Sequence, residues 1–199
     1  MEPVQPIVLV GGSSRRFGRD KLREPLSAAN HEWLVDRSIA ALRAVFGPAV
    51  KLVGRCDPLV LARGDGAIED TYADRGPIGG IVSALEQGRA AFVLAGDLPN
   101  ITADVVSRIM TTAAHAPTAW AVLARSDRLE PCVGLYRSAA LPALTSRLHD
   151  AAGRRSLHDA LPAEHVVGVE CGAEHLVNAN VPEDLATTAN HRPTRQAPG

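Results

Sequence analysis

Short apolar runs alternate with longer amphipathic stretches along the chain. Six runs are nearly continuous, as is typical of strands covered on both faces: residues 7–10, 50–53, 91–95, 120–123, 133–136 and 166–169. Between them, residues 35–46 have helical spacing, residues 78–87 end before Gly88, and Thr102 is placed to cap a helix through Met110. The alternation predicts an α/β fold, an open and mostly parallel sheet with helices on both faces.

The first apolar run ends at a loop rich in glycine, serine and cations. Residues 11–21 read Gly-Gly-Ser-Ser-Arg-Arg-Phe-Gly-Arg-Asp-Lys. Glycines allow backbone N–H groups to approach an anion closely, and the cations add positive charge within the same loop. The spacing fits neither the P-loop motif nor the Gly-x-Gly-x-x-Gly dinucleotide motif. The loop therefore predicts a nucleotide site of another kind.

Asp97 follows the apolar run 91–95, in the sequence Gly-Asp-Leu-Pro. Ligands of parallel sheets bind beyond the carboxyl ends of the strands, so we expect Asp97 and the first loop to share one edge. A carboxylate there suits Mg²⁺, which binds one or two carboxylates and completes its shell with phosphate oxygens and water. The alternative is that Asp97 only caps a turn.

A third segment runs from Asp70 through Gly76 and Pro77 to a second glycine pair, Gly79 and Gly80. The Gly-Pro step predicts an extended turn, and the glycine pair predicts bare backbone at the start of a helix. A flat base or a ribose could pack there. An ordinary turn followed by a helix is the alternative.

Three further features have two interpretations each. Arg154 and Arg155 either meet an anionic second substrate or form a solvated turn, and Asn180 either approaches a metal or caps a following helix. Cys132 is expected to be a buried small residue rather than a nucleophile, because no histidine stands in an obvious paired motif.

Composition narrows the class of protein. The 199 residues carry a formal net charge of -1, so no overall basic field favours nucleic acid. The three cysteines are widely spaced, which indicates neither a disulfide framework nor a zinc site. No leader-like segment or long apolar run occurs, so we expect a cytoplasmic protein that does not bind membranes. We expect one domain over residues 1–189 and a flexible tail at 190–199.

The first loop resembles the signature loop of the nucleotidyltransferases, most closely that of the molybdenum cofactor guanylyltransferases. Val10 and Phe17 replace the usual Ala and Met and leave the charges unchanged. Segments 70–80, 96–99, 130–137 and 177–185 resemble later motifs of the family, in the family's order. One departure is clear, because Gly54 and Arg55 stand where these enzymes often carry an Asn that contacts the base.

The resemblance implies a Rossmann-like nucleotidyltransferase fold and a reaction. GMP would pass from GTP to the phosphate of molybdopterin, with Mg²⁺, to give the guanine dinucleotide and pyrophosphate. The implied catalytic residues are Arg16, Lys21 and Asp97, and the implied metal ligands are Asp97 and, more weakly, Asn180. The implied nucleotide-binding residues are Leu9, Val10, Gly11, Gly12, Ser13, Lys21, Asp70, Gly76, Pro77 and Asp97.

Other functions share parts of this pattern. A CTP-dependent molybdopterin cytidylyltransferase, or a nucleotidyltransferase acting on a sugar phosphate or phospholactate, would keep the first loop and Asp97. A non-catalytic protein that binds GTP or the cofactor is a second class. Under the main interpretation the partners are GTP, molybdopterin or Mo-molybdopterin, and a molybdoenzyme or cofactor-insertion protein that receives the product.

Overall fold

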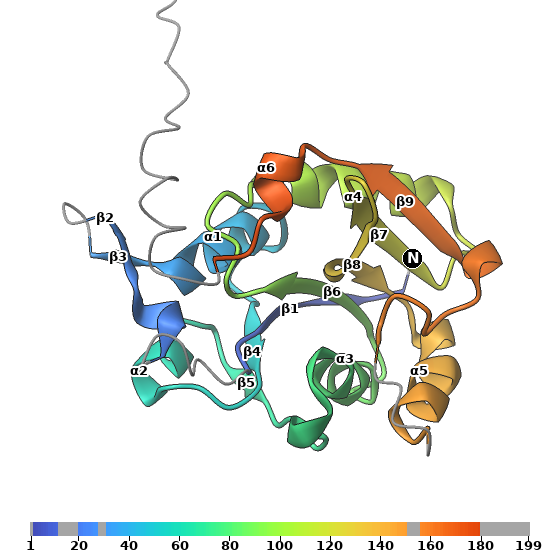
Figure 1. Cartoon of the computed structure of the whole chain (residues 1–199), viewed down its shortest axis with the longest axis horizontal. Helices are drawn as coiled ribbons and strands as arrows, with labels where there is room; N and C mark the ends of the chain where they lie inside the picture. Colours follow the sequence, from blue (N-terminus) through green and yellow to red (C-terminus); the bar gives the residue numbers. More distant parts are fainter. Residues whose placement is uncertain (1, 12–19, 28–30, 151–155, 180–199) are drawn as a thin grey trace, which may run out of the picture.

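The computed structural model describes residues 2–11, 20–27, 31–150 and 156–179. Within them, a seven-stranded sheet has the order β5-β4-β1-β6-β8-β7-β9 (Figure 1). Only β8 runs against its neighbours, so the predicted mostly parallel α/β sheet is confirmed. The strands are β1 (Val4–Leu9), β4 (Lys51–Val53), β5 (Ala67–Ile68), β6 (Ala90–Ala95), β7 (Ala121–Arg125), β8 (Leu129–Tyr136) and β9 (Val166–Glu170). A separate pair joins β2 (Pro25–Ser27) to β3 (Glu32–Trp33).

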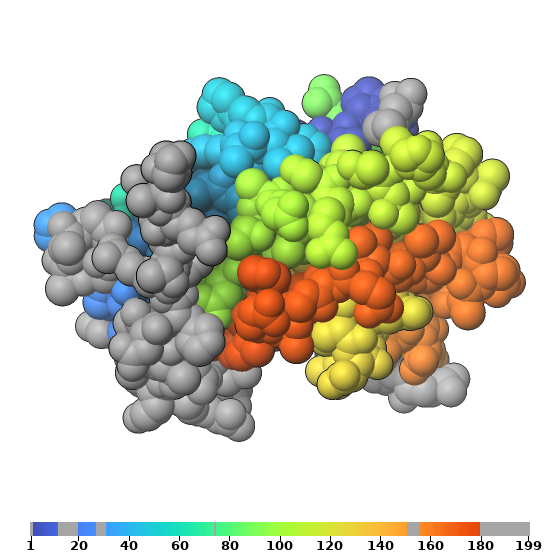
Figure 2. Space-filling view, turned by 90° about the horizontal axis from the view of Figure 1, so that it is seen from above, coloured from blue at the N-terminus to red at the C-terminus, as the bar shows by residue number. Residues whose placement is uncertain are grey.

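Helices cover both faces of the sheet, and each face has its own apolar core. Helices α1 (Leu34–Phe46) and α4 (Ala103–His115) pack on one face, where Figure 2 shows them side by side. Helices α3 (Pro77–Leu85) and α5 (Leu141–Leu148) pack on the other (Figure 1). The shorter elements are α2 (Pro58–Leu61), α6 (Ala173–Leu176) and the 3₁₀ turns η1 (Lys21–Arg23), η2 (Ala73–Arg75), η3 (Ser138–Ala140) and η4 (Ala163–His165).

Strand β1 lies at the point where the strand order reverses. It pairs in parallel with β4 and β6, and Leu9 is in register with Val53 and with Ala95. The chain first adds β4 and β5 on one side of β1 and then crosses to place β6 on the other. Such a reversal leaves a crevice beyond the carboxyl ends of the strands, where open α/β sheets bind ligands.

All six predicted strands are present, with ends displaced by a few residues. Thr102 occupies the N-cap position of α4, but its hydroxyl makes no capping hydrogen bond, so that part of the prediction is wrong. Within the described residues, no helix combines the length and apolar character needed to cross a membrane.

Candidate active site

Lys21 and Asp97, distant in sequence, form an ion pair at the carboxyl edge of the sheet. The Nζ atom of Lys21 lies 2.5 Å from Oδ2 of Asp97. Lys21 belongs to η1, directly before the β2–β3 pair, and Asp97 follows β6. Their side chains are 22% and 17% exposed, so a ligand in the crevice can reach both. The structure thus brings together the two charged residues on which the sequence interpretation depends.

The chain near residue 179 docks onto this ion pair. The N–H of Ala179 donates to the carbonyl of Asp97 at 2.9 Å, and the carbonyl of Ala179 accepts from Lys21 Nζ at 3.3 Å. Ala179 is fully buried. Asn180, the weaker predicted metal ligand, is the next residue in sequence and lies outside the described residues, so its role stays a prediction.

The first loop leaves β1 by crossing the end of β4. Val10 N–H donates to the carbonyl of Val53 at 2.9 Å, and Gly11 then passes over Gly54. Gly54 has φ +119°, and a Cβ there would lie 2.5 Å from the backbone nitrogen of Gly11. A side chain at position 54 would thus displace Gly11, so this backbone does not accept a base-contacting side chain at Gly54. Gly12, Ser13 and Arg16, predicted to contact phosphates, lie outside the described residues.

The end of β6 is fixed tightly against β1. Gly96 N–H donates to the carbonyl of Leu9 at 3.0 Å, and the buried Ser38 hydroxyl donates to the carbonyl of Ala95 at 2.7 Å. A Cβ at Gly96 would lie 3.1 Å from Leu22 and 3.2 Å from the Leu9 carbonyl oxygen. These contacts hold the backbone before Asp97 in place.

Asp70 lies beyond the end of β5, at the same edge of the sheet as Asp97. Its Oδ1 accepts from Tyr72 N–H at 3.0 Å and from the Ser83 hydroxyl at 3.5 Å. These contacts orient the carboxylate, while no hydrogen bond from another described residue reaches its Oδ2.

The Gly-Pro turn begins α3 as the sequence predicted. Gly76 has φ +68° at the N-cap position, and Pro77 begins the helix. The expectation of bare backbone at the next glycine pair is wrong. A Cβ at Gly79 would lie 2.3 Å from the Tyr72 carbonyl oxygen, and one at Gly80 2.8 Å from Leu9. Protein atoms therefore occupy the space beside Gly79 and Gly80, whereas a Cβ at Gly76 would meet no atom within 4 Å, and the roles of Gly76 and Pro77 in nucleotide binding stay predictions.

Comparison with known proteins decides the family. A family model described as a MobA-like NTP transferase domain matches residues 6–166. The chain belongs to this family. A probable molybdenum cofactor guanylyltransferase of Chloroflexus aggregans is 32% identical over 90% of each chain. A molybdenum cofactor guanylyltransferase of Pseudomonas putida is 31% identical over 93% of this chain and 97% of the relative.

The solved structures show the same fold. Molybdopterin-guanine dinucleotide biosynthesis protein A from Archaeoglobus fulgidus superposes with a TM-score of 0.71 at 24% identity, covering 92% of this chain and 96% of that one. The family match includes Lys21, Asp70 and Asp97 and ends before Ala179, which nevertheless contacts the ion pair.

Cys132 lies on β8 beside the ion pair of this MobA-like NTP transferase domain. Burial, and then the negative charge of Asp97, raise the pKa of its thiol to about 12. A thiol with that pKa stays protonated at neutral pH and is a poor nucleophile. The side chain is only partly buried, so the expectation of a buried residue is wrong, whereas the raised pKa agrees with the expectation that Cys132 is not a nucleophile.

Within the part of the chain that the structure describes, Asp97 does not belong to a preformed metal site. Among the described residues, no group of three or more His, Cys, Asp and Glu side chains could hold a metal ion. A lone carboxylate fits Mg²⁺ bound partly by substrate phosphates and water, and it does not fit a structural zinc site.

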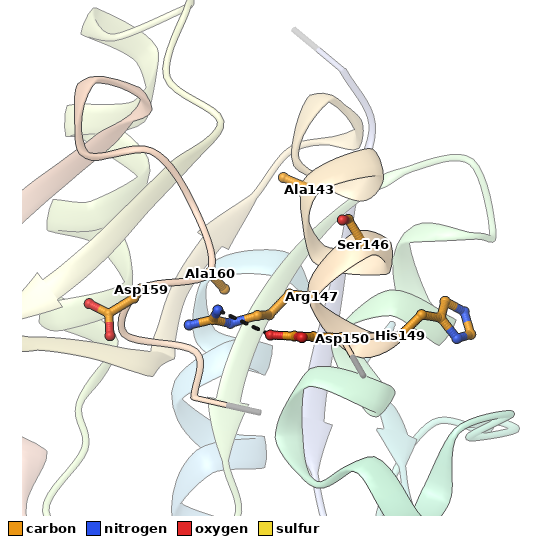
Figure 3. Close-up of a pocket in the computed structure, with 7 residues that line it drawn as sticks. All are labelled: Ala143, Ser146, Arg147, His149, Asp150, Asp159 and Ala160. Carbon is orange, nitrogen blue, oxygen red and sulfur yellow. Dashed lines mark ion pairs between the residues drawn. The ribbon is translucent and has the colours of Figure 1, made fainter. Parts of the chain in front are cut away.

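A hollow of about 550 Å³ lies between α5 with the residues that follow it and residues 159–160, and its lining includes neither Lys21 nor Asp97 (Figure 3). Arg147 and Asp150, which both line it, form an ion pair with 3.8 Å between Nη1 and Oδ2. The ring centroids of His149 and Tyr72 are 6.1 Å apart in an edge-to-face arrangement. Arg154 and Arg155 lie outside the described residues, so their contact with a second substrate stays a prediction.

Proposed function

We propose that this protein transfers GMP from GTP to the phosphate of molybdopterin and releases pyrophosphate. The observation that carries the proposal is the Lys21–Asp97 pair at the carboxyl edge of the sheet. It stands in a chain about 30% identical to proteins named molybdenum cofactor guanylyltransferase. A cation and a carboxylate at this edge supply the two charges that a nucleotide triphosphate with its metal requires.

The reaction needs no covalent intermediate on the protein. An oxygen of the acceptor phosphate forms a bond to the α-phosphorus of GTP as the bond to the β-phosphate oxygen breaks, and pyrophosphate leaves with the electron pair. Positioning and charge neutralisation then account for most of the rate. The backbone of residues 11–13 and the side chains of Arg16 and Lys21 bind the phosphates.

Asp97 would hold Mg²⁺, which supplies positive charge to the phosphate oxygens. Before nucleotide binds, the short contact with Lys21 occupies Oδ2 of Asp97. The phosphates of GTP compete with Asp97 for Lys21 Nζ, so nucleotide binding releases Asp97 Oδ2 from the lysine. The same lysine thus neutralises a carboxylate before binding and a phosphate after it.

Asp70 favours guanine over cytosine. A carboxylate accepts hydrogen bonds, and guanine presents two neighbouring donors, N1–H and the N2 amine, where cytosine presents acceptors at N3 and O2. Tyr72 N–H fixes Oδ1 of Asp70, which leaves Oδ2 for a ligand. No side chain is available at Gly54 to add a second base contact.

The test is the conversion of molybdopterin by the purified protein with Mg²⁺ and either GTP or CTP. We expect dinucleotide and pyrophosphate with GTP, and a loss of about 10²-fold or more in turnover for Lys21→Ala and for Asp97→Asn. Lys51→Ala is the matched control, because Lys51, the only other lysine, lies on β4 with Nζ 3.4 Å from the carbonyl oxygen of Asp65.

Each alternative gives a different result. Preference for CTP indicates a cytidylyltransferase, and turnover of a sugar phosphate or phospholactate in place of molybdopterin indicates another acceptor. GTP binding without release of pyrophosphate indicates a binding protein. Wild-type turnover by Lys21→Ala would overturn the role of the ion pair.

A further inference from the structure

Asp57 contacts the turn that carries Lys21 on both sides of the lysine. Its backbone N–H donates to Oδ2 of Asp20 at 2.9 Å, and its own Oδ2 accepts from Nη1 of Arg23 at 2.7 Å. The other oxygen of Asp20 accepts from Leu22 N–H at 3.1 Å and caps η1. Lys21 therefore lies between two residues that are both tied to Asp57.

Asp57 is itself anchored to the body of the protein. It is the N-cap of α2, where its Oδ1 accepts from Leu59 N–H at 2.8 Å. That hydrogen bond and the one from Arg23 hold the pKa of Asp57 below its usual range, so the carboxylate is charged at neutral pH. Val60 in the same helix is fully buried in the core. Asp57 thus caps a short helix that Val60 anchors in the core, and this anchor supports η1.

We infer that Asp57 is a positioning residue for Lys21, holding η1 through Asp20 and Arg23 so that Nζ stays on Asp97. The effect on turnover rests on the proposed function, since the position of Lys21 matters there only if the lysine serves the transfer. The effect on the position itself does not depend on any reaction. A misplacement of about 1 Å can cost about 10²-fold in rate, so a residue outside the reacting groups can matter.

A purely structural role for Asp57 makes a different prediction. If Asp57 only caps α2, its replacement lowers stability and leaves Lys21 where it is. Asp57→Asn separates the two roles, because the amide oxygen can still cap Leu59 N–H and the backbone N–H can still donate to Asp20, while the charge facing Arg23 is lost. Arg23→Gln removes the same link from the other partner and serves as a second variant.

Asp65 offers a matched control. Its carboxylate also accepts from an arginine, Arg43 at 2.7 Å, and from a backbone N–H, that of Val50 at 2.9 Å. Its carbonyl faces Lys51 at 3.4 Å. Because Lys21 and Lys51 are the only lysines in the chain, an amine-reactive reagent reports on both clusters in one experiment.

The first experiment labels folded protein briefly with an amine-reactive ester and measures each lysine by peptide mass spectrometry. A reagent must displace Asp97 to reach Lys21 Nζ, so we expect Asp57→Asn and Arg23→Gln to raise labelling of Lys21 severalfold relative to Lys51. Asp65→Asn is expected to leave labelling of Lys21 unchanged. Wild-type labelling of Lys21 in folded Asp57→Asn would overturn the inference.

The second experiment tests whether Asp57 acts through Lys21. We expect Asp57→Asn to lower kcat for GMP transfer about tenfold when Lys21 is present and to have no further effect in the Lys21→Ala background. Where turnover is too slow to measure, GTP affinity from calorimetry gives the same comparison. The four proteins are the wild type, Asp57→Asn, Lys21→Ala and the double variant. Equal losses in both backgrounds contradict the inference. A wild-type protein that transfers no GMP contradicts the proposed function instead, and the labelling result still decides the position of Lys21.

Discussion

Replacing Gly54 with alanine is expected to weaken both the fold and nucleotide binding. The new Cβ would lie 2.5 Å from the nitrogen of Gly11 and 2.8 Å from its Cα, and backbone atoms cannot rotate out of the way as a side chain can. The φ of +119° at Gly54 is itself strained for any residue with a Cβ. The first loop must therefore move away from β4.

Gly47 allows the backbone strain of a positive φ to be separated from the clash of a new Cβ with neighbouring atoms. It also has a positive φ, +73°, but a Cβ there would meet no atom within 4 Å. Gly47→Ala should thus cost only backbone strain, about 1–3 kcal/mol of the free energy of unfolding. Gly54→Ala adds an overpacking cost of about 1–3 kcal/mol, which gives a total of about 2–6 kcal/mol.

The assay is urea unfolding of the wild type and both variants, followed by calorimetric titration with GTP in Mg²⁺. We expect Gly54→Ala to be the less stable variant and to bind GTP more weakly than the wild type. Gly47 precedes β4 at the opposite edge of the sheet, so Gly47→Ala should bind GTP normally. Equal unfolding free energies for the two variants, with unchanged GTP affinity, would refute the reasoning.

Two further predictions concern titratable groups. Because burial raises the pKa of Cys132 to about 12, iodoacetamide at pH 8 should leave this thiol unmodified in the folded protein and modify it in urea; rapid modification of the folded protein would contradict the assignment. The hydrogen bonds from Arg43 hold the pKa of Asp65 below its usual 3.8, so this carboxylate stabilises the fold above pH 3.8 and loses that effect as the pH falls through its folded pKa. The difference in unfolding free energy between wild type and Asp65→Asn should be full at pH 7 and shrink below pH 3.8, and a constant difference would count against the ion pair.

The sequence predicted the strands of the central sheet that are long enough to show a pattern. Buried parallel strands such as β1 and β6 appear as continuous apolar runs, and the polar residues that follow them mark the ligand edge. Strand β5 of this sheet has two residues, as does β3 of the separate pair, and both are too short to produce a pattern. The sequence pointed to Asp97 because it follows an apolar strand, and to Lys21 because it is the last residue of the first-loop motif.

Contacts between distant segments could not be predicted from local pattern. The sequence assigned Lys21 to phosphates, and its pairing with Asp97 follows only once η1 is placed against the end of β6. Asp57 shows a local signal, since Asp before Pro58 is typical of a helix start, but its contacts with Asp20 and Arg23 depend on β4 lying beside β1. The glycine pair Gly79 and Gly80 was misread because the backbone of Tyr72 fills the space beside Gly79 and the side chain of Leu9 fills the space beside Gly80.

At the carboxyl edge of the sheet, different residues shape the backbone and supply the charges. Strands β1, β4 and β6 are followed by Gly11, Gly54 and Gly96, and at Gly54 the backbone of Gly11 lies too close for a side chain. The charges come from Lys21 and Asp97, which are partly exposed, and such pairs contribute only about 0–1 kcal/mol to stability. Lys21→Ala should therefore lower turnover about 10²-fold or more with little change in urea unfolding, whereas Gly54→Ala should impair both. A Lys21→Ala protein as unstable as Gly54→Ala would assign the ion pair to the fold rather than to the reaction.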